Sequence, residues 1–175
     1  MQDRARQFEA IALPHLDAAY NLARWLLRNE QAADDVVQEA FLRALRYFGS
    51  FHGDNAKPWL LGIVRNACFT WLHDNRGAEQ MLEFDEDRDS DEQDLAPRRN
   101  AENPEQLLSS KQDSAALNAA IGSLPTAFRE VLILRELEEL SYDDIARIAG
   151  IPLGTVMSRL SRARSLLRVA MVRAD

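Results

Sequence analysis

The stretch Leu140-Ser-Tyr-Asp-Asp-Ile-Ala-Arg-Ile-Ala-Gly-Ile-Pro-Leu-Gly-Thr-Val-Met-Ser-Arg-Leu-Ser-Arg-Ala-Arg164 decides the fold of the second half of this 175-residue chain. Apolar residues recur at helical spacing on either side of Gly150, which predicts a short helix, a tight turn and a longer helix with clustered arginines. Ser141 is expected to cap the first helix, and Asp144 stands at the capping-box position. Two helices joined in this way are the layout of a DNA-binding helix-turn-helix, whose second helix enters the major groove.

The two faces of this predicted helix pair differ in chemistry. The residues expected to form one shared core are Ile145, Ala146, Ala149, Ile151, Val156, Leu160 and Ala163. The residues expected on the opposite side of the second helix are Thr155, Met157, Ser158, Ser161 and Arg162. Arginines beside serine and threonine suit a surface that contacts phosphates and base edges. The alternative is an ordinary amphipathic helix pair whose arginines are only solvated.

Composition indicates a globular protein without disulfides or metal sites. Hydrophobic residues make up 46% of the sequence, which is enough for one or two small domains. Cys68 is the single cysteine and lies in an apolar helical segment, so we expect it in the core. No Cys/His spacing predicts a zinc site, and neither a metal nor a cofactor is expected. Charges interrupt every apolar segment before membrane-spanning length, so we expect a cytoplasmic protein that does not insert into a membrane.

The net charge of −7 is concentrated in one segment. Residues 79–113 hold twelve acidic and four basic side chains, a local balance of −8, which leaves the rest of the chain at +1. After residue 158 the sequence holds several arginines and one acidic residue, Asp175, so the C-terminal part is locally cationic. An acidic total therefore does not exclude a DNA-binding surface.

Apolar periodicity predicts an all-α chain with two small helical domains. In the first domain, residues 5–76, we expect a helix that bends near Pro14 and ends near residue 28, a second helix over 32–47 and a third over 57–73. Residues 77–103 lack periodicity and are rich in acidic side chains, which is typical of a flexible linker. The second domain, residues 104–172, is expected to contain four helices and to end in the helix-turn-helix.

One face of the expected second helix is acidic and polar. Asp35, Gln38 and Glu39 are spaced so that their side chains lie close together, while Val37 and Phe41 face the core. The pattern indicates a docking patch for a partner protein. Paired carboxylates also serve acid-base catalysis or metal binding, but no histidine or convergent pocket is implied nearby. A merely solvated helix face remains the alternative.

The third helix and the loop before it combine aromatic, amide and cationic residues. The helix carries Arg65 and Asn66 and is followed by Arg76, and the loop reads Phe51-His-Gly-Asp-Asn-Ala56. Single-stranded DNA is bound by aromatic stacking and a cationic rim, and a flipped base needs a pocket with amide or backbone partners. Aromatic residues at helical spacing also belong to cores, so the residues alone leave both interpretations open.

The order of these parts closely resembles the extracytoplasmic-function group of bacterial sigma factors over nearly the whole chain. The resemblance implies that the first domain is a sigma-2 domain, in which Asp35, Gln38 and Glu39 bind the clamp helices of the largest subunit of RNA polymerase. It also implies that this domain melts the minus-10 element and captures a flipped base of the non-template strand. The residues that would contact minus-10 DNA are Phe51, His52, Asn55, Arg65, Asn66 and Arg76.

The same resemblance implies that the second domain is a sigma-4 domain, which reads the minus-35 element and rests on the polymerase flap. The residues that would contact minus-35 DNA are Thr155, Met157, Ser158, Arg159, Ser161 and Arg162. Many relatives carry arginine where this chain has Met157, which offers an apolar contact instead of a hydrogen bond and predicts a different minus-35 preference. Stress-responsive members are commonly held inactive by an anti-sigma factor that covers both domains, so we expect such a partner.

The acidic linker suggests a separate hypothesis. In the family this segment threads the active cleft and the RNA exit path of the polymerase, which are lined with cationic residues. The run Glu83-Phe-Asp-Glu-Asp-Arg-Asp-Ser-Asp-Glu92 would mimic nucleic acid there and be displaced by growing RNA. The alternative is a solvated tether.

Two further classes of function compete with a sigma factor. A conventional helix-turn-helix repressor or activator would bind a palindromic operator unaided, with half-sites about one helical turn apart. A sigma mimic would titrate an anti-sigma factor without reading DNA, and the arginine-bearing helix argues against it. An enzyme is the least favoured class, because no nucleophile, base and orienting group occur together in the sequence.

Overall fold

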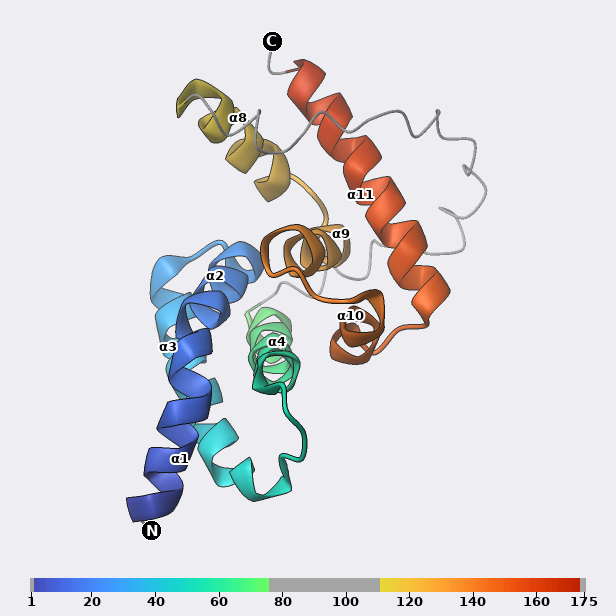
Figure 1. Ribbon diagram of the computed structural model, residues 1–175. Coiled ribbons are helices and arrows are strands. Elements are labelled where there is room, and N and C mark those ends of the chain that lie inside the picture. Colours follow the sequence, from blue (N-terminus) through green and yellow to red (C-terminus); the bar gives the residue numbers. More distant parts are fainter. Residues whose placement is uncertain (1, 76–110, 174–175) are drawn as a thin grey trace.

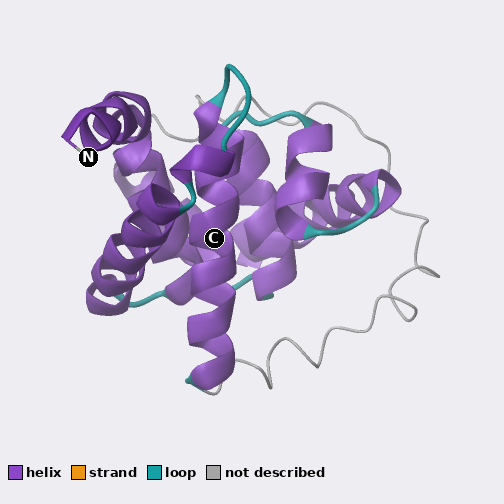
Figure 2. Cartoon of the chain, turned by 90° about the horizontal axis from the view of Figure 1, so that it is seen from below, coloured by secondary structure: helices purple, strands orange, loops and turns teal. Residues whose placement is uncertain are grey.

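The computed structural model describes residues 2–75 and 111–173, and every regular element in these two ranges is a helix (Figure 2). The predicted all-α class is therefore confirmed. The acidic linker over 77–103 and Arg76 lie outside the described residues. Figure 1 shows the two described ends of the chain on opposite sides of the molecule, with α1 at one end and the last turns of α11 at the other.

The first range contains four α-helices and two short 3-10 turns. Their bounds are α1 Gln2–Ala12, η1 Leu13–His15, α2 Leu16–Leu27, α3 Glu30–Arg46, η2 Phe48–Ser50 and α4 Ala56–Asp74. The bend expected near Pro14 is the 3-10 turn between α1 and α2. Helix α3 begins two residues before the predicted start, because the side chain of Asn29 accepts a hydrogen bond from the Ala32 amide at 3.1 Å and caps the helix.

The second range contains four α-helices and a π-helical turn. Their bounds are α8 Lys111–Gly122, α9 Thr126–Leu132, η3 Ile133–Leu137, α10 Tyr142–Ala149 and α11 Leu153–Arg173. The sequence predicts an ordinary helix through Leu137, whereas the last turn widens and the Glu138 amide donates to the Ile133 carbonyl at 3.1 Å. This wide turn redirects the chain into α10, and Glu139 takes a positive φ of 58° where the direction changes.

The larger of two apolar clusters joins the two halves of the chain, and the smaller one, which includes Phe8 and Leu60, lies within the first half. Fully buried side chains come from α2, α3 and α4 and equally from η3, α10 and α11: Leu22, Leu26, Val37, Leu61, Val64, Ile133, Leu134, Ile145 and Leu160. Because these side chains form one connected cluster, the two predicted domains pack together in this structure. Sequence periodicity alone left that question open.

Helix α4 is the element around which this packing is organised. It lies between α2 and α3 on one side and α10 on the other (Figure 1). Gly62 of α4 faces Ile148 of α10, and a Cβ at position 62 would lie 4.0 Å from Cγ1 of Ile148, an ordinary van der Waals distance. Helix α9 packs against α2 of the first half and α11 of the second. The first half thus contacts the helix-turn-helix directly.

The buried face of α11 provides a test of the shared core. Replacing the fully buried Leu160 by alanine is expected to lower the free energy of unfolding by about 2–5 kcal/mol, through lost burial and a residual cavity. Met157 lies one turn earlier with 53% of its surface exposed, so Met157→Ala should change the free energy of unfolding by less than about 0.5 kcal/mol. Urea unfolding followed by circular dichroism measures both, and equal costs would contradict this assignment of faces.

Candidate nucleic-acid interface

The helix-turn-helix is fixed by local hydrogen bonds. The Ser141 hydroxyl accepts from the Asp144 amide at 3.1 Å and caps α10. Gly150 takes the left-handed conformation, with φ of 68°, and the Ile151 amide donates to the Ala146 carbonyl at 3.0 Å. The start of α11 is closed by amides of Thr155 and Val156 that donate to the Pro152 carbonyl. The orientation of α11 relative to α10 is therefore set by these few residues.

The amino-terminal half of α11 presents a polar face to solvent. Val156, Leu160 and Ala163 are buried, whereas Met157, Ser158 and Ser161 are exposed. Thr155, Arg159 and Arg162 are half-buried at the border of this face. Burial and then the positive charge of Arg65 lower the pKa of Arg159 from its usual value. The minus-35 assignment of these six residues remains a prediction.

The acidic patch of α3 is exposed, as its spacing predicts. Asp35, Gln38 and Glu39 all lie at the surface, and Glu39 pairs with Arg43 at 3.5 Å. Gln38 also lines an apolar groove of about 410 Å³ between α1, α2 and α3, whose walls include Phe41 and Leu42. Sequence reasoning missed Leu42, which is 62% exposed. The sequence could have indicated Leu42, because it stands four residues after Gln38 and therefore lies on the same face of the helix.

The loop before α4 has structural contacts in this conformation. Phe51 stacks with Phe48 at a centroid distance of 6.4 Å and lies against Trp59 at 4.9 Å. The Asn55 side chain caps α4 by accepting from the Lys57 amide at 3.2 Å. His52 is exposed to solvent. The assignment of Phe51, His52 and Asn55 to minus-10 DNA therefore stays a prediction.

Arg65 binds a residue of the second half instead of lying open to solvent. Its Nε donates to Oε1 of Glu130 at 2.5 Å, and its guanidinium lies 3.9 Å from the centre of the Phe69 ring. The Glu130 side chain has no exposed surface, and burial raises its pKa while the charge of Arg65 opposes that rise. Asn66 next to it is exposed. No sequence pattern links positions 65 and 130, and this pair was not predicted.

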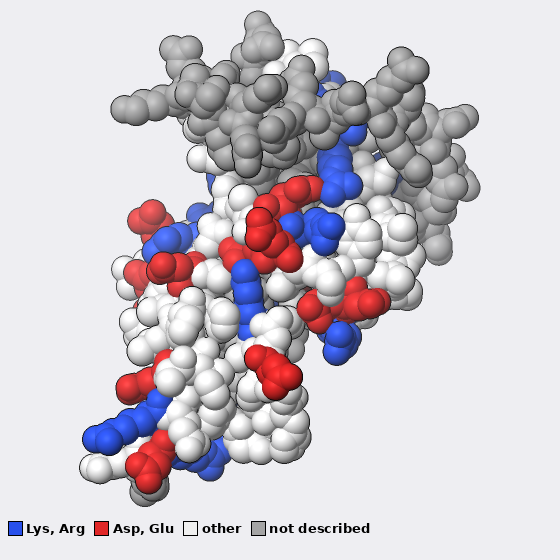
Figure 3. Space-filling model, in the orientation of Figure 1, with Lys and Arg blue, Asp and Glu red and all other residues white. Residues whose placement is uncertain are grey.

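Charges of both signs alternate over the face seen in Figure 3. Within residues 2–75 and 111–173, no group of three or more histidine, cysteine, aspartate or glutamate side chains is arranged to hold a metal ion. No helix of the described chain is long and apolar enough to cross a membrane. The described surface combines the exposed polar face of α11 with the exposed acidic patch of α3.

These surfaces define the class: an all-helical protein in two parts, one with an exposed acidic helix face and the other with a helix-turn-helix. Comparison with known proteins identifies the family. The family model of Sigma-70 region 2 matches residues 11–77, and that of Sigma-70, region 4 matches residues 114–167. The chain is 35% identical to the RNA polymerase sigma-H factor of Pseudomonas aeruginosa, over 95% of this chain and 86% of that protein. It belongs to the extracytoplasmic-function (ECF) sigma factors of the sigma-70 family.

Two further relatives are also named as ECF sigma factors. The ECF RNA polymerase sigma factor SigE of Mycolicibacterium smegmatis is 35% identical over 161 residues, and this chain spans 60% of its length. The ECF RNA polymerase sigma-E factor of Escherichia coli (strain K12) is 37% identical over 76% of this chain and 70% of that protein.

Two solved structures are similar over nearly the whole chain. The sigma factor RpoE in complex with the anti-sigma factor NepR from Bartonella quintana matches with a TM-score of 0.70 and 30% identity, over 97% of this chain and 99% of that one. CnrH in complex with the cytosolic domain of CnrY matches with a TM-score of 0.62 and 26% identity, over 98% and 90%.

The reactivity of the Cys68 thiol tests whether the core beneath Arg65 is intact. Burial and then the charge of Glu130 raise the pKa of its thiol to about 12, against the smaller opposite effect of Arg65. An unfolded thiol has a pKa of about 8.5, so at pH 8 the folded protein holds far less thiolate than the unfolded chain. We expect a thiol-reactive dye to modify Cys68 at least roughly a hundredfold more slowly in buffer than in urea. The control is Gln7→Cys in a Cys68→Ala background, which should react at similar rates in both, since Gln7 is exposed.

Proposed function

We propose that this chain is the promoter-specificity subunit of a bacterial RNA polymerase. It would bind the core enzyme through the acidic patch on α3, read the minus-35 element with the amino-terminal half of α11, and help to melt the minus-10 element with α4 and the preceding loop. The single observation that carries the proposal is the combination, in one member of the ECF family, of an exposed reading helix and an exposed acidic docking face. The chain would catalyse no reaction itself, since RNA synthesis belongs to the polymerase.

The partners follow from the surfaces. Asp35, Gln38 and Glu39 would contact the clamp helices of the largest subunit, with an apolar side chain of that subunit against Leu42. The polymerase flap would rest on the outer surface of the second half, where Leu166, Val169 and Val172 are exposed on α11. The likeness to two sigma chains in complexes, one of them with an anti-sigma factor, supports control of this chain by an anti-sigma factor. The proposed site of action is the cytoplasm, where polymerase and chromosome meet.

The decisive experiment is transcription in vitro from fragmented genomic DNA by bacterial core polymerase, with and without this protein, followed by mapping of RNA 5′ ends. New start sites that share two spaced upstream elements would support a sigma factor. Binding to a palindromic site without polymerase, together with no new start sites, would instead indicate a conventional helix-turn-helix regulator.

The docking patch is tested by a charge-matched pair of variants. Asp35→Ala with Glu39→Ala is expected to weaken core binding at least roughly tenfold, because each lost contact at the centre of an interface costs about 1 kcal/mol or more. Asp17→Ala with Glu30→Ala removes the same charge from exposed positions on α2 and α3 outside the patch and should leave the affinity unchanged. Fluorescence titration of labelled protein with core polymerase measures both. Equal losses would show a general effect of net charge.

The reading helix is tested at Met157. Met157→Arg adds a hydrogen-bonding cation to the exposed face and is expected to change the preferred base at one minus-35 position, with a discrimination of about 1–3 kcal/mol. Asn118→Arg adds the same charge on the exposed side of α8, away from the start of α11, and should leave the preference as it is (Figure 1). Transcription from a promoter library randomised in the minus-35 region measures the preference. A uniform gain at all sequences would show contact with phosphates only.

A further inference from the structure

Two large apolar side chains lie exposed next to each other at the start of α11. Leu153 is 44% exposed and Met157 is 53% exposed. They are four residues apart, so their side chains are neighbours on one side of the helix. The buried core contains Val156, Leu160 and Ala163 of this helix, and neither Leu153 nor Met157 is part of that cluster. A single exposed apolar residue needs no explanation, whereas a neighbouring pair on the second helix of a helix-turn-helix indicates a contact outside the chain.

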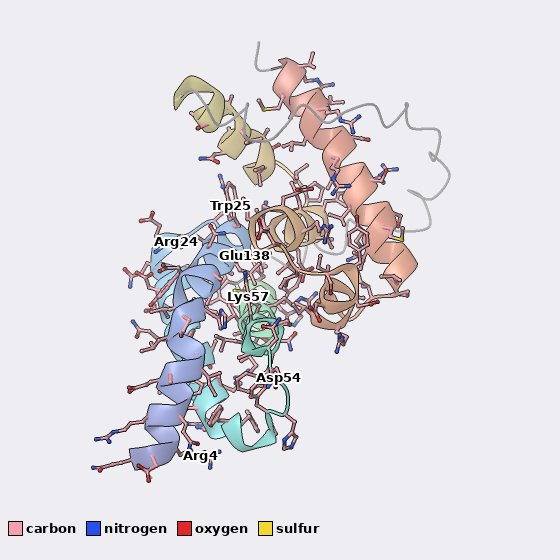
Figure 4. All side chains as sticks on the ribbon, in the orientation of Figure 1. Arg4, Arg24, Trp25, Asp54, Lys57 and Glu138 are labelled. Atoms are coloured by element: carbon pink, nitrogen blue, oxygen red, sulfur yellow. The ribbon has the colours of Figure 1, made fainter. Side chains whose placement is uncertain are left out.

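The pair lies where a partner can reach it. In Figure 4 the first turns of α11 lie at the edge of the molecule, beyond α10 as seen from the labelled Lys57 of α4. The amides of Thr155 and Val156 donate to the Pro152 carbonyl at 3.0 and 3.1 Å and hold this end of the helix in place. The two apolar side chains are therefore presented on a fixed helix end.

Neither packing nor backbone conformation within the described chain requires the glycine at position 154. Gly154 lies in the first turn of α11, and its φ is not positive. Its own helix backbone and chain neighbours aside, no atom of the described residues lies within 4 Å of where a Cβ would stand. Glycine is less favourable than alanine in a helix, because it loses more backbone entropy on folding. The missing side chain instead makes room for the close approach of something outside the chain.

The exposed polar residues beside the pair offer few hydrogen bonds to base edges. In the amino-terminal half of α11, the exposed residues other than glycine are Leu153, Met157, Ser158 and Ser161. The Ser158 hydroxyl already donates to the Thr155 carbonyl of its own helix at 3.2 Å. In the major groove, the apolar feature of a base edge is the 5-methyl group of thymine. A face whose largest exposed side chains are leucine and methionine is therefore suited to thymine methyl groups.

We propose that Leu153 and Met157 contact thymine methyl groups of the minus-35 element, and that Gly154 lets this end of α11 approach the bases. The inference rests on the proposed function and names the chemical group that the helix recognises. Residues four apart are about 6 Å apart along a helix, so the two side chains would meet thymines roughly one or two base-pair steps apart. The flexible thioether chain of Met157 adapts readily to an apolar surface.

The first test removes methyl groups from the DNA and leaves the protein unchanged. The full chain with core polymerase is bound to a promoter found by start-site mapping, and each thymine of the minus-35 element, on both strands, is replaced in turn by deoxyuridine. Deoxyuridine pairs as thymidine does and lacks only the 5-methyl group. At two thymines we expect roughly fourfold weaker binding, the loss that corresponds to one buried methyl group, and no change at the others. Fluorescence anisotropy at constant salt measures the affinity.

Alanine variants then identify which side chain meets which methyl group. Met157→Ala is expected to abolish the effect of deoxyuridine at one of the two thymines, and Leu153→Ala is expected to abolish it at the other. Leu13→Ala removes a similarly exposed side chain from η1, 53% exposed, and should keep both effects. Thermal unfolding of each variant checks that the fold is intact. The inference is overturned if no thymine responds to the loss of its methyl group, or if both responses persist in both α11 variants.

The close approach at position 154 has its own measurement. Gly154→Ala adds a Cβ that meets open space in the described chain, so we expect an unfolding temperature that is unchanged or higher. Promoter binding by the same variant should weaken, because the added methyl group lies between the helix and the bases. An alanine variant that binds the promoter as tightly as the original protein would overturn the close approach.

Failure of this inference and failure of the proposed function are separate results. Transcription from new start sites whose minus-35 elements hold no methyl-sensitive thymine would leave the sigma factor in place and overturn the inference. If the protein directs no transcription, duplexes that the protein alone selects from a random library are tested with the same substitutions. Methyl-sensitive thymines there would support the same contacts in a conventional helix-turn-helix regulator, and their absence would overturn them.

Discussion

An ionised carboxylate without exposed surface needs a compensating partner, and in this protein the partner of Glu130 is Arg65, from the other half of the chain. An apolar interface tolerates small rotations of its two sides, whereas a buried ion pair loses its attraction once the donor and acceptor atoms separate. The pair therefore fixes how α9 lies against α4. Other contacts between the halves, among them Lys57 with Glu138 and Arg129 with the Leu26 carbonyl, are made in the same arrangement.

The same arrangement explains how an acidic protein carries DNA-binding residues without presenting a large cationic surface. Part of its positive charge, at Lys57 and Arg65, is neutralised from inside by acids of the second half. In the amino-terminal half of α11, the exposed residues Met157, Ser158 and Ser161 bear no charge. A helix face whose exposed positions bear no charge neutralises few phosphates by itself, so its affinity for DNA is expected to be weak until polymerase adds its own contacts.

The chain belongs to the ECF sigma factors, and the structure shows how its two halves are arranged. The likeness to RpoE in its complex with NepR extends over 97% of this chain with a TM-score of 0.70, so it covers both halves and not one domain alone. In the present chain the two halves contact each other directly, through side chains of this chain alone. An anti-sigma factor that bound such a closed form would stabilise contacts that already exist, and it would need to supply fewer of its own.

Local features of the fold followed from the sequence by itself. The cap at Ser141, the left-handed Gly150 and the burial of Val156, Leu160 and Ala163 all depend on residues a few positions apart, where helical periodicity and turn chemistry are informative. The exposure of Asp35, Gln38 and Glu39 followed from the same rule. The roles of the site residues in binding DNA and polymerase are still predictions, because they depend on partners.

Contacts between distant residues were decided only by the tertiary structure. Arg65 and Glu130 are 65 positions apart and Lys57 and the Glu138 carbonyl are 81, and no periodic pattern relates such positions. The widened turn over Ile133–Leu137, between α9 and α10, was likewise seen only in the structure. The sequence by itself determined two helical units and the faces that each presents. The tertiary structure determined that those units close on one another, because burial of Glu130 is favourable only where Arg65 is brought to meet it.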